Sequence, residues 1–325
     1  MDKLYARILE HDVAASCNRL CRLSIHTMCA IGTPNNPRPA APPTTRCGFA
    51  GTRMLSVIAG VTALLVTVSV AATSCLAPDS APSGAGTPLA AEFTDLAKRL
   101  HARMGLVVSA VGANPQQLVL GEWASGPAWS TMKVPLIIAA LREEHPPVIT
   151  DSMRAAITES DNAAAESIWE KLGDPVTAAH KVEDVLRQYS DPTTVEWRKV
   201  RPQFTAFGQT IWSLTNQARF AAAAVCDTAN APVFTLMGQV VTDQRWGLGL
   251  IPNTRFKGGW GPSPTGSYLV RQLGVLEMPT GLTAVAVATQ PASGLFADGT
   301  EELTEASKWL MRHLAALPVG RCDHQ

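Results

Sequence analysis

Residues 129–136 read WSTMKVPL and place Ser130 and Lys133 three residues apart. On a helix, side chains at this spacing lie on one face, so the hydroxyl and the amine would be neighbours. A helix start favours negative charge, and a buried lysine that loses its proton can act as a base toward a hydroxyl. The pair therefore indicates a nucleophilic serine, although this spacing also occurs by chance in many ordinary helices.

Two further motifs follow along the chain. Residues 160–162 read Ser-Asp-Asn, and residues 257–259 read Lys-Gly-Gly within a strand-like run. Each also has an ordinary structural interpretation, because Ser-Asp-Asn is a good helix start and Lys-Gly-Gly suits the end of a strand. We expect Asp161 to cap and brace its turn. The three motifs in this order are far more specific than any one of them.

The set S-x-x-K, S-D-N and K-G-G resembles the motifs of the serine penicillin-recognising family. That family includes class A β-lactamases and penicillin-binding D-Ala-D-Ala peptidases, with S-x-x-K, S-D-N and K-T-G. The resemblance covers about residues 90–318. It implies a hydrolase without metal or cofactor, whose ligand is a β-lactam or a peptide of the cell wall. It also implies an antiparallel sheet with flanking helices and an inserted helical domain.

The resemblance implies a role for each matching position. Ser130 would take the acyl group, and Lys133 would help to remove its proton. Ser160 would pass a proton to the leaving nitrogen, and Asn162 would hydrogen-bond the amide side chain of the substrate. Lys257 would support Ser160 and attract the substrate carboxylate.

The same resemblance gives a role to the backbone near the third motif. The N–H groups of Ser130 and Trp260 would form an oxyanion hole, in which donors usually contribute a large stabilising effect. Gly259 would let the substrate backbone lie close to the strand. Arg271, on the next strand, is a candidate for a second carboxylate anchor.

The chain departs from the family in the spacing of its first two motifs and in the residues of the third. Only 30 residues separate Ser130 from Ser160, which predicts a trimmed helical domain. Lys-Gly-Gly lacks the hydroxyl that normally binds the carboxylate of the β-lactam. Ser263, Thr265 or Ser267 in the following turn are candidates to replace it.

The glutamate that activates the deacylating water in class A enzymes has no clear counterpart. The family's E-x-x-L-N pattern is absent, and Glu196 is the only acid after Asp191 in the corresponding stretch. Basic residues surround it in the sequence: Arg198, Lys199 and Arg201. Glu166, counted along a helix from Ser160, is expected to point away from the site. We therefore predict acylation followed by slow or absent turnover.

The order of predicted elements supports the same fold. Residues 90–104 have helical periodicity, and residues 105–113 and 116–123 read as two strands of a hairpin. Residues 130–245 are mostly helical, strand patterns follow, and a final amphipathic helix is expected to open at Thr300. The two early and three late strands predict an α/β (α+β) fold with one five-stranded antiparallel sheet. The domain is predicted over residues 92–318, with a helical subdomain at about 130–245.

The N-terminal part predicts export. Residues 54–72 contain nineteen residues without charge, enough to cross a bilayer, and basic residues precede them. Small residues then lead to Cys75 in a lipobox-like pattern, so a lipid anchor, a cleaved signal peptide and an uncleaved helix all remain open. We divide this part into a lead (1–53), a signal or anchor (54–75) and a linker (76–91), with a tail at 319–325. The domain is expected outside the cytoplasm, tethered to the membrane in the cell envelope.

Composition excludes some classes. The chain has 325 residues, 46% hydrophobic and 17% charged, with net charge zero, which is typical of a globular protein with a large core. A neutral balance gives no electrostatic reason to expect nucleic acid. The seven histidines form no HExxH pattern, and no zinc spacing is apparent among the cysteines. Outside the cytoplasm, we expect Cys226 and Cys322 to form a disulfide.

Two other hypotheses for the function remain. The chain could be a lipoprotein that keeps the fold and binds a cell-wall ligand or a protein partner without catalysis. The presence of Lys133 argues against this hypothesis, because a buried lysine without a catalytic use would lower the stability of the protein. A Ser-His-Asp esterase is disfavoured, since no G-x-S-x-G occurs.

Overall fold

A computed structural model of the chain describes residues 86–112 and 116–322. The predicted lead (1–53), the signal or anchor segment (54–75) with Cys75 and most of the linker lie outside these residues. Helix α2 (Gly86–Arg99) begins inside the predicted linker. Within the described ranges, no single helix has the length and apolar character to cross a membrane. In this part of the chain, one bent pair of helices, Leu214–Ala224 and Thr228–Met237, reaches that length and composition together.

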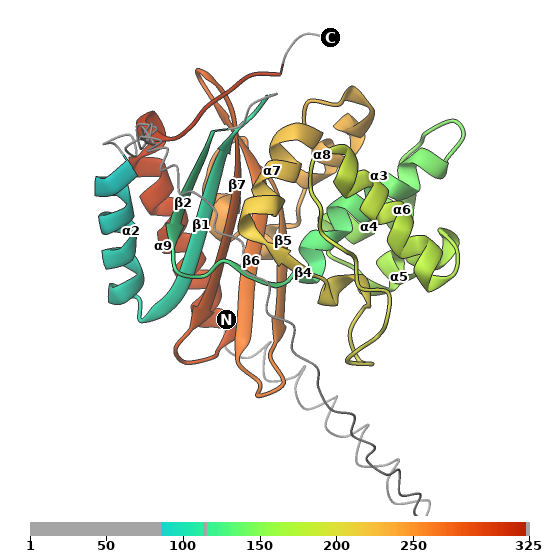
Figure 1. Cartoon of the computed structure of the whole chain (residues 1–325), viewed down its shortest axis with the longest axis horizontal. Coiled ribbons are helices and arrows are strands. Elements are labelled where there is room, and N and C mark those ends of the chain that lie inside the picture. The colour runs from blue at the N-terminus through green and yellow to red at the C-terminus, as the bar shows by residue number, and fades with distance from the viewer. Residues whose placement is uncertain (1–85, 113–115, 323–325) are drawn as a thin grey trace, which may run out of the picture. The chain divides into compact units, whose positions relative to one another are not determined.

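One five-stranded sheet forms the centre of the domain (Figure 1). Its strands run in the spatial order β2-β1-β7-β6-β5, and every neighbouring pair is antiparallel. The early hairpin joins the three late strands through the pairing of β1 with β7, which confirms the predicted sheet. The strands are β1 (Ala102–Ala110), β2 (Gln117–Gly121), β5 (Arg255–Pro262), β6 (Tyr268–Met278) and β7 (Gly281–Pro291).

Helices cover both faces of the sheet, and the strand sequence explains how. Val285 and Val287 on β7 pack in the core with α2 and α9 (Phe296–Arg312), whereas Ala284, Ala286 and Ala288 pack in the core with α7 (Leu214–Ala224). Side chains alternate between the faces of a strand, so one strand presents a branched face and a small face. The small face suits α7, which is itself rich in buried alanines.

Two predicted helix ends were wrong. The first helix ends at Arg99, and Met104 lies buried in β1 instead. The apolar side chain of Met104 fits the hydrophobic pattern of a strand as well as that of a helix. The pattern alone therefore did not show where the helix ends and the strand begins. The last helix begins at Phe296 rather than at Thr300, whose hydroxyl donates to Ala297 O inside the first turns.

The helical group lies beside β5 (Figure 1). Its centre is α3, in which every residue from Lys133 to Leu141 is buried. Asp161 accepts a hydrogen bond from Ala164 N and so caps α5, as predicted. Helix α7 falls inside the predicted helical range but packs on the sheet. The group comprises α3 (Lys133–Glu143), α4 (Asp151–Thr158), α5 (Asn162–Lys171), α6 (Pro175–Gln188) and α8 (Ala231–Met237).

Cys226 and Cys322 form a disulfide, which confirms the predicted pair. The bond joins the segment after α7 to the C-terminal tail, across a sequence separation of 96 residues. The tail is also held by the sheet, because Gly320 and Leu282 exchange backbone hydrogen bonds.

Candidate functional site

Ser130 stands on a tight turn between a short ribbon and α3. The ribbon pairs β3 (Ser125–Pro127) with β4 (Ile211–Ser213), and the turn is a 3₁₀ segment, Trp129–Met132. Trp129 has a φ of 49°, in the left-handed region that bulky residues rarely adopt. Such strain persists where the surroundings fix it, and it is common at functional sites. Here the Trp129 ring packs edge-on against Phe204, with 5.1 Å between the ring centroids.

Lys133 is fully buried at the first position of α3. Its Nζ donates to Ser160 O at 2.6 Å, to Asn162 Oδ1 at 2.8 Å and to Asp161 O at 3.2 Å. Burial lowers the pKa of Lys133 from its ordinary value to about 7, against the opposing effect of the Asp161 charge. Near neutral pH this lysine therefore exists in both protonation states, so the neutral amine is available as a base.

Ser160 connects two lysines. Its Oγ accepts from Lys257 Nζ at 2.8 Å and lies 3.5 Å from Lys133 Nζ. Lys257 is buried on β5, and its Nζ also donates to Gly258 O at 2.9 Å. Burial lowers the pKa of Lys257 well below its usual value, and the charge of Lys133 lowers it further. The Ser160 hydroxyl thus lies within hydrogen-bonding distance of both Lys133 and Lys257.

Gly259 brings β5 against the turn that carries Ser130. A Cβ atom at Gly259 would lie 2.9 Å from both Ser130 N and Thr131 N. A Cβ atom at Gly261 would lie 2.5 Å from the ring of Trp129. The two glycines thus make room for this turn, which is a different use of Gly259 from the predicted close approach of a substrate backbone.

A pocket of about 370 Å³ opens in front of these groups. It is lined by the predicted nucleophile Ser130, by Asn162 at the start of α5 and by Trp260 on β5. Lys133, Ser160 and Lys257 contact one another behind it. The structure therefore brings these six predicted site residues into one region. The walls carry further aromatic side chains, of which Phe204 and Tyr268 are marked by no sequence motif: Trp129, Phe204 and Tyr268.

Glu166 lines the same pocket, so the prediction that it points away was wrong. Its Oε2 lies 3.2 Å from Nζ of Lys199, which comes from the loop at 191–207 and also lines the pocket. The error came from counting the helix from Ser160. Ser160 has a φ of 61° and precedes α5, which begins at Asn162. Glu166 comes four residues after Asn162, so the two side chains lie on the same face of α5.

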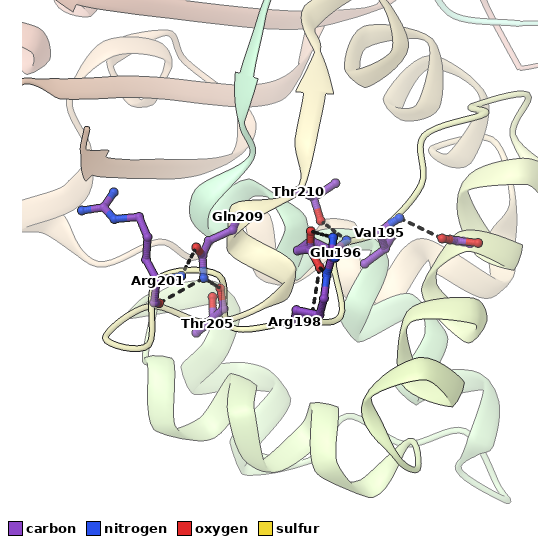
Figure 2. A network of polar contacts seen from close by, with 8 residues as sticks. Val195, Glu196, Arg198, Arg201, Thr205, Gln209 and Thr210 are labelled. Atoms are coloured by element: carbon purple, nitrogen blue, oxygen red, sulfur yellow. Dashed lines mark hydrogen bonds and ion pairs between the residues drawn. The ribbon is translucent and has the colours of Figure 1, made fainter. Parts of the chain in front are cut away.

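Glu196 is held away from Ser130. Its carboxylate accepts from Arg198 at 2.9 and 3.1 Å, and these hydrogen bonds lower its pKa. Its backbone N–H donates to Thr210 Oγ1 beside β4. Figure 2 shows this loop network, in which the Gln209 side chain also holds Arg201 and Thr205. Glu196 does not line the Ser130 pocket, so it is not placed to activate a water there.

Arg271 is not a carboxylate anchor, so that prediction was wrong. Its guanidinium is fully buried and donates to the carbonyls of Gly126, Pro127 and Trp212 at 3.0 to 3.2 Å. It also donates to Gln217 Oε1 at 2.7 Å. Burial lowers the pKa of Arg271 to about 9. The guanidinium therefore ties together the two strands of the ribbon that leads into the Ser130 turn.

Gln217 links Arg271 to the turn itself through hydrogen bonds. Its Nε2 donates to Thr131 Oγ1 at 2.8 Å, and the Thr131 hydroxyl donates to Ala128 O. Gln217 and Thr131 are both fully buried. No short motif marks them in the sequence, because their contacts join residues 86 positions apart.

None of the proposed replacement hydroxyls lines the Ser130 pocket. The hydroxyls of Ser263 and Thr265 hydrogen-bond each other at 2.8 Å, and Ser263 and Ser267 line a neighbouring pocket. Among residues 86–112 and 116–322, no group of three or more His, Cys, Asp or Glu side chains could hold a metal.

Comparison with solved structures identifies the fold. The chain is similar to the TLA-3 extended-spectrum β-lactamase, with a TM-score of 0.57 and 14% identity over 70% of this chain and 99% of that one. It is also similar to the class A β-lactamase from Mycobacterium abscessus, with a TM-score of 0.57 and 15% identity over 70% and 99%. It is similar too to a representative class A β-lactamase from Bacteroides cellulosilyticus DSM 14838. The TM-score is 0.57 and the identity is 16%, over 71% of this chain and 98% of that one.

These likenesses show that the chain has the serine β-lactamase fold, as the motifs implied. No protein-family model matches the chain. No curated protein matches it either.

Proposed function

We propose that the chain is a membrane-tethered serine hydrolase that acts outside the cytoplasm and is acylated at Ser130. Its ligands would be β-lactams or cell-wall peptides that end in D-Ala-D-Ala. The observation that carries this proposal is the contact of Ser160 Oγ with both Lys133 and Lys257, next to a pocket lined by Ser130. Buried lysines with lowered pKa values beside a pocket are more typical of functional sites than of purely structural contacts.

The acylation step follows from these groups. Neutral Lys133 takes the proton of the Ser130 hydroxyl, and Ser130 Oγ bonds to the carbonyl carbon of the ligand. The oxyanion that forms is stabilised by the backbone N–H groups of Ser130 and Trp260. Ser160 gives its proton to the leaving nitrogen as the carbon–nitrogen bond breaks, and the proton from Lys133 replaces it. The products are an ester at Ser130 and a released amine, which stays attached to the ester in a β-lactam.

Deacylation is proposed to be slow. The hydrolysis of the ester needs a carboxylate that activates water, and Glu166 is the one carboxylate lining the pocket in the described part of the chain. Its Oε2 is engaged by Lys199 Nζ at 3.2 Å, so this oxygen is not free to hold a water. The ester is therefore expected to persist.

The membrane tether is supported by the sequence alone. The uncharged run at residues 54–72 and the lipobox-like residues before Cys75 favour export followed by retention at the membrane. The cell envelope is also where the proposed peptide ligands occur.

A non-catalytic binding protein is the second candidate. Two observations favour it: the donors of Lys133 are directed to the Ser160 and Asp161 carbonyls and to Asn162, and residue 258 carries no hydroxyl. In this candidate the aromatic pocket holds a cell-wall ligand, and Ser130 forms no ester.

Intact-mass spectrometry of the full chain with benzylpenicillin separates these candidates. An adduct with the mass of the penicillin that appears over minutes and persists for hours supports the proposed function. Ser130→Ala should give no adduct, whereas Ser125→Ala, outside the pocket, should behave like the unchanged chain. An adduct that clears as penicillin is consumed would show a true β-lactamase. If no adduct forms with benzylpenicillin or with a D-Ala-D-Ala peptide thioester, the binding candidate replaces the enzyme.

A further inference from the structure

A second cavity of about 500 Å³ adjoins the Ser130 pocket. Both are lined by Trp129, Gly261 and Pro262. Between them, Arg201 reaches out of its loop and donates to Pro262 O (Figure 2 shows the side chain extending away from the loop network). Of the predicted catalytic side chains, none lines the second cavity, so it is a separate feature with one shared wall.

The floor and mouth of this cavity are largely apolar. Trp123, Trp129 and Leu269 are buried in its wall. Ile211 and Val200 stand at its mouth with 62% and 63% of their surface exposed. Large aliphatic side chains at a concave opening gain stability when an apolar group covers them. The volume lies in the range of sites for small molecules rather than for protein partners.

The rim carries positive charge. Arg103 on β1 and Arg201 both line the cavity. Among the ion pairs of the described residues, neither arginine has a carboxylate partner. Glu196 is the one acid lining the cavity in that part of the chain, and its carboxylate is already held by Arg198 at 2.9 Å. An apolar floor under two arginines suits a ligand that is apolar at one end and anionic at the other.

We infer that this cavity binds a small amphiphilic anion, with an aromatic or branched apolar body and one carboxylate or sulfonate group. The body lies against Trp123, Trp129 and Leu269. The anionic group meets Arg103 and Arg201. The inference is independent of acylation at Ser130, because the two cavities differ in every charged residue that lines them.

Titration calorimetry of the full chain with 2-naphthoate tests the inference, with 2-naphthylmethanol as the neutral comparison. The naphthoate should bind about tenfold more tightly than the alcohol, as expected for a charge-assisted contact at a partly exposed site. Arg103→Gln should weaken naphthoate binding about fivefold and leave the alcohol unchanged. Ile211→Glu, which places a carboxylate at the mouth, should weaken naphthoate binding more than the binding of the alcohol.

Two control variants make the test specific. Lys199→Gln removes a cation that lines only the Ser130 pocket, and Ser130→Ala removes the proposed nucleophile. Both should leave naphthoate affinity unchanged. Binding that is lost with Lys199→Gln but not with Arg103→Gln would place the anion in the Ser130 pocket and overturn the inference. Equal affinity for naphthoate and the alcohol, or no binding of either, would also overturn it.

Discussion

Lys133 and Lys257 converge on a single atom, because their Nζ atoms lie 3.5 and 2.8 Å from Ser160 Oγ. Both side chains are buried, and the charge of Lys133 lowers the pKa of Lys257. Two buried ammonium groups this close repel each other, so at least one lysine is expected to be neutral near pH 7. Their titration is a property of the pair. A neutral amine beside a hydroxyl is the arrangement that general-base chemistry needs.

The rate of acylation at Ser130 is predicted to depend on pH. The pKa of Lys133 is lowered to about 7, so the neutral amine dominates above that pH and the ammonium below it. Acylation by benzylpenicillin should therefore reach a plateau above about pH 7 and fall about tenfold for each pH unit below. Stopped-flow or quenched mass measurements between pH 5 and 9 check this. A rate that stays flat across that range would exclude Lys133 as the base.

Adjacent glycines on β5 should respond differently to an added methyl group. A Cβ at Gly258 would lie 3.4 Å from the Trp260 ring, an ordinary contact, whereas a Cβ at Gly259 would lie 2.9 Å from Ser130 N. Gly259→Ala must push the Ser130 turn away, and misplacement by about 1 Å can cost about 100-fold in rate. Gly258→Ala should keep acylation within about threefold, since the site has room. Parallel acylation rates with both variants provide the measurement, and similar losses would contradict the described packing.

The sequence predicted the sheet because alternation and turn residues depend only on near neighbours. It also predicted that Lys133, Ser160 and Lys257 would meet, because the three motifs resemble those of a known family. Glu166 was mispredicted because one residue with positive φ, Ser160, shifts the phase of the helix. Loop 191–207 carries no periodicity, so the ion pair of Lys199 with Glu166 could not be predicted. The side of the sheet on which Arg271 lies depends on how β6 pairs with β5 and β7. That pairing is a tertiary property, so the position of Arg271 could not be predicted from the sequence.

Lys199 is predicted to slow the loss of the acyl group. Its Nζ lies 3.2 Å from Glu166 Oε2 in the Ser130 pocket and keeps that carboxylate from acting as a base. Lys199→Gln frees that oxygen to hold a water and should shorten the lifetime of the penicilloyl ester about tenfold, a fraction of what a well-placed general base contributes. The double variant with Glu166→Gln should return the lifetime to its original value. Equal lifetimes in all three proteins, followed by intact mass, would exclude Glu166 from deacylation.

Arg271 is predicted to position the Ser130 turn from behind. Arg271→Met leaves the buried carbonyls of Gly126, Pro127 and Trp212 without this donor, which should lower the free energy of unfolding by about 3 kcal/mol. The acylation rate should also fall at temperatures where the variant is fully folded. Arg154→Met, an exposed arginine bound to Gln239, is the matched control and should change neither. A folded Arg271→Met variant with an unchanged rate would reduce Arg271 to a purely stabilising role.

The disulfide between Cys226 and Cys322 is predicted to stabilise the domain without affecting its chemistry. It closes a sequence separation of 96 residues, and the loss of such a constraint corresponds to about 4.7 kcal/mol of chain entropy in the unfolded state. The Cys226→Ser Cys322→Ser variant should therefore unfold at lower denaturant concentration, with a steeper slope because its unfolded chain is less compact. Its acylation rate below the transition should equal that of the unchanged chain, because neither cysteine lines the Ser130 pocket. Equal denaturation midpoints for the two proteins, with the disulfide of the unchanged chain verified by mass, would mean that the backbone pairing of Gly320 with Leu282 already holds the tail.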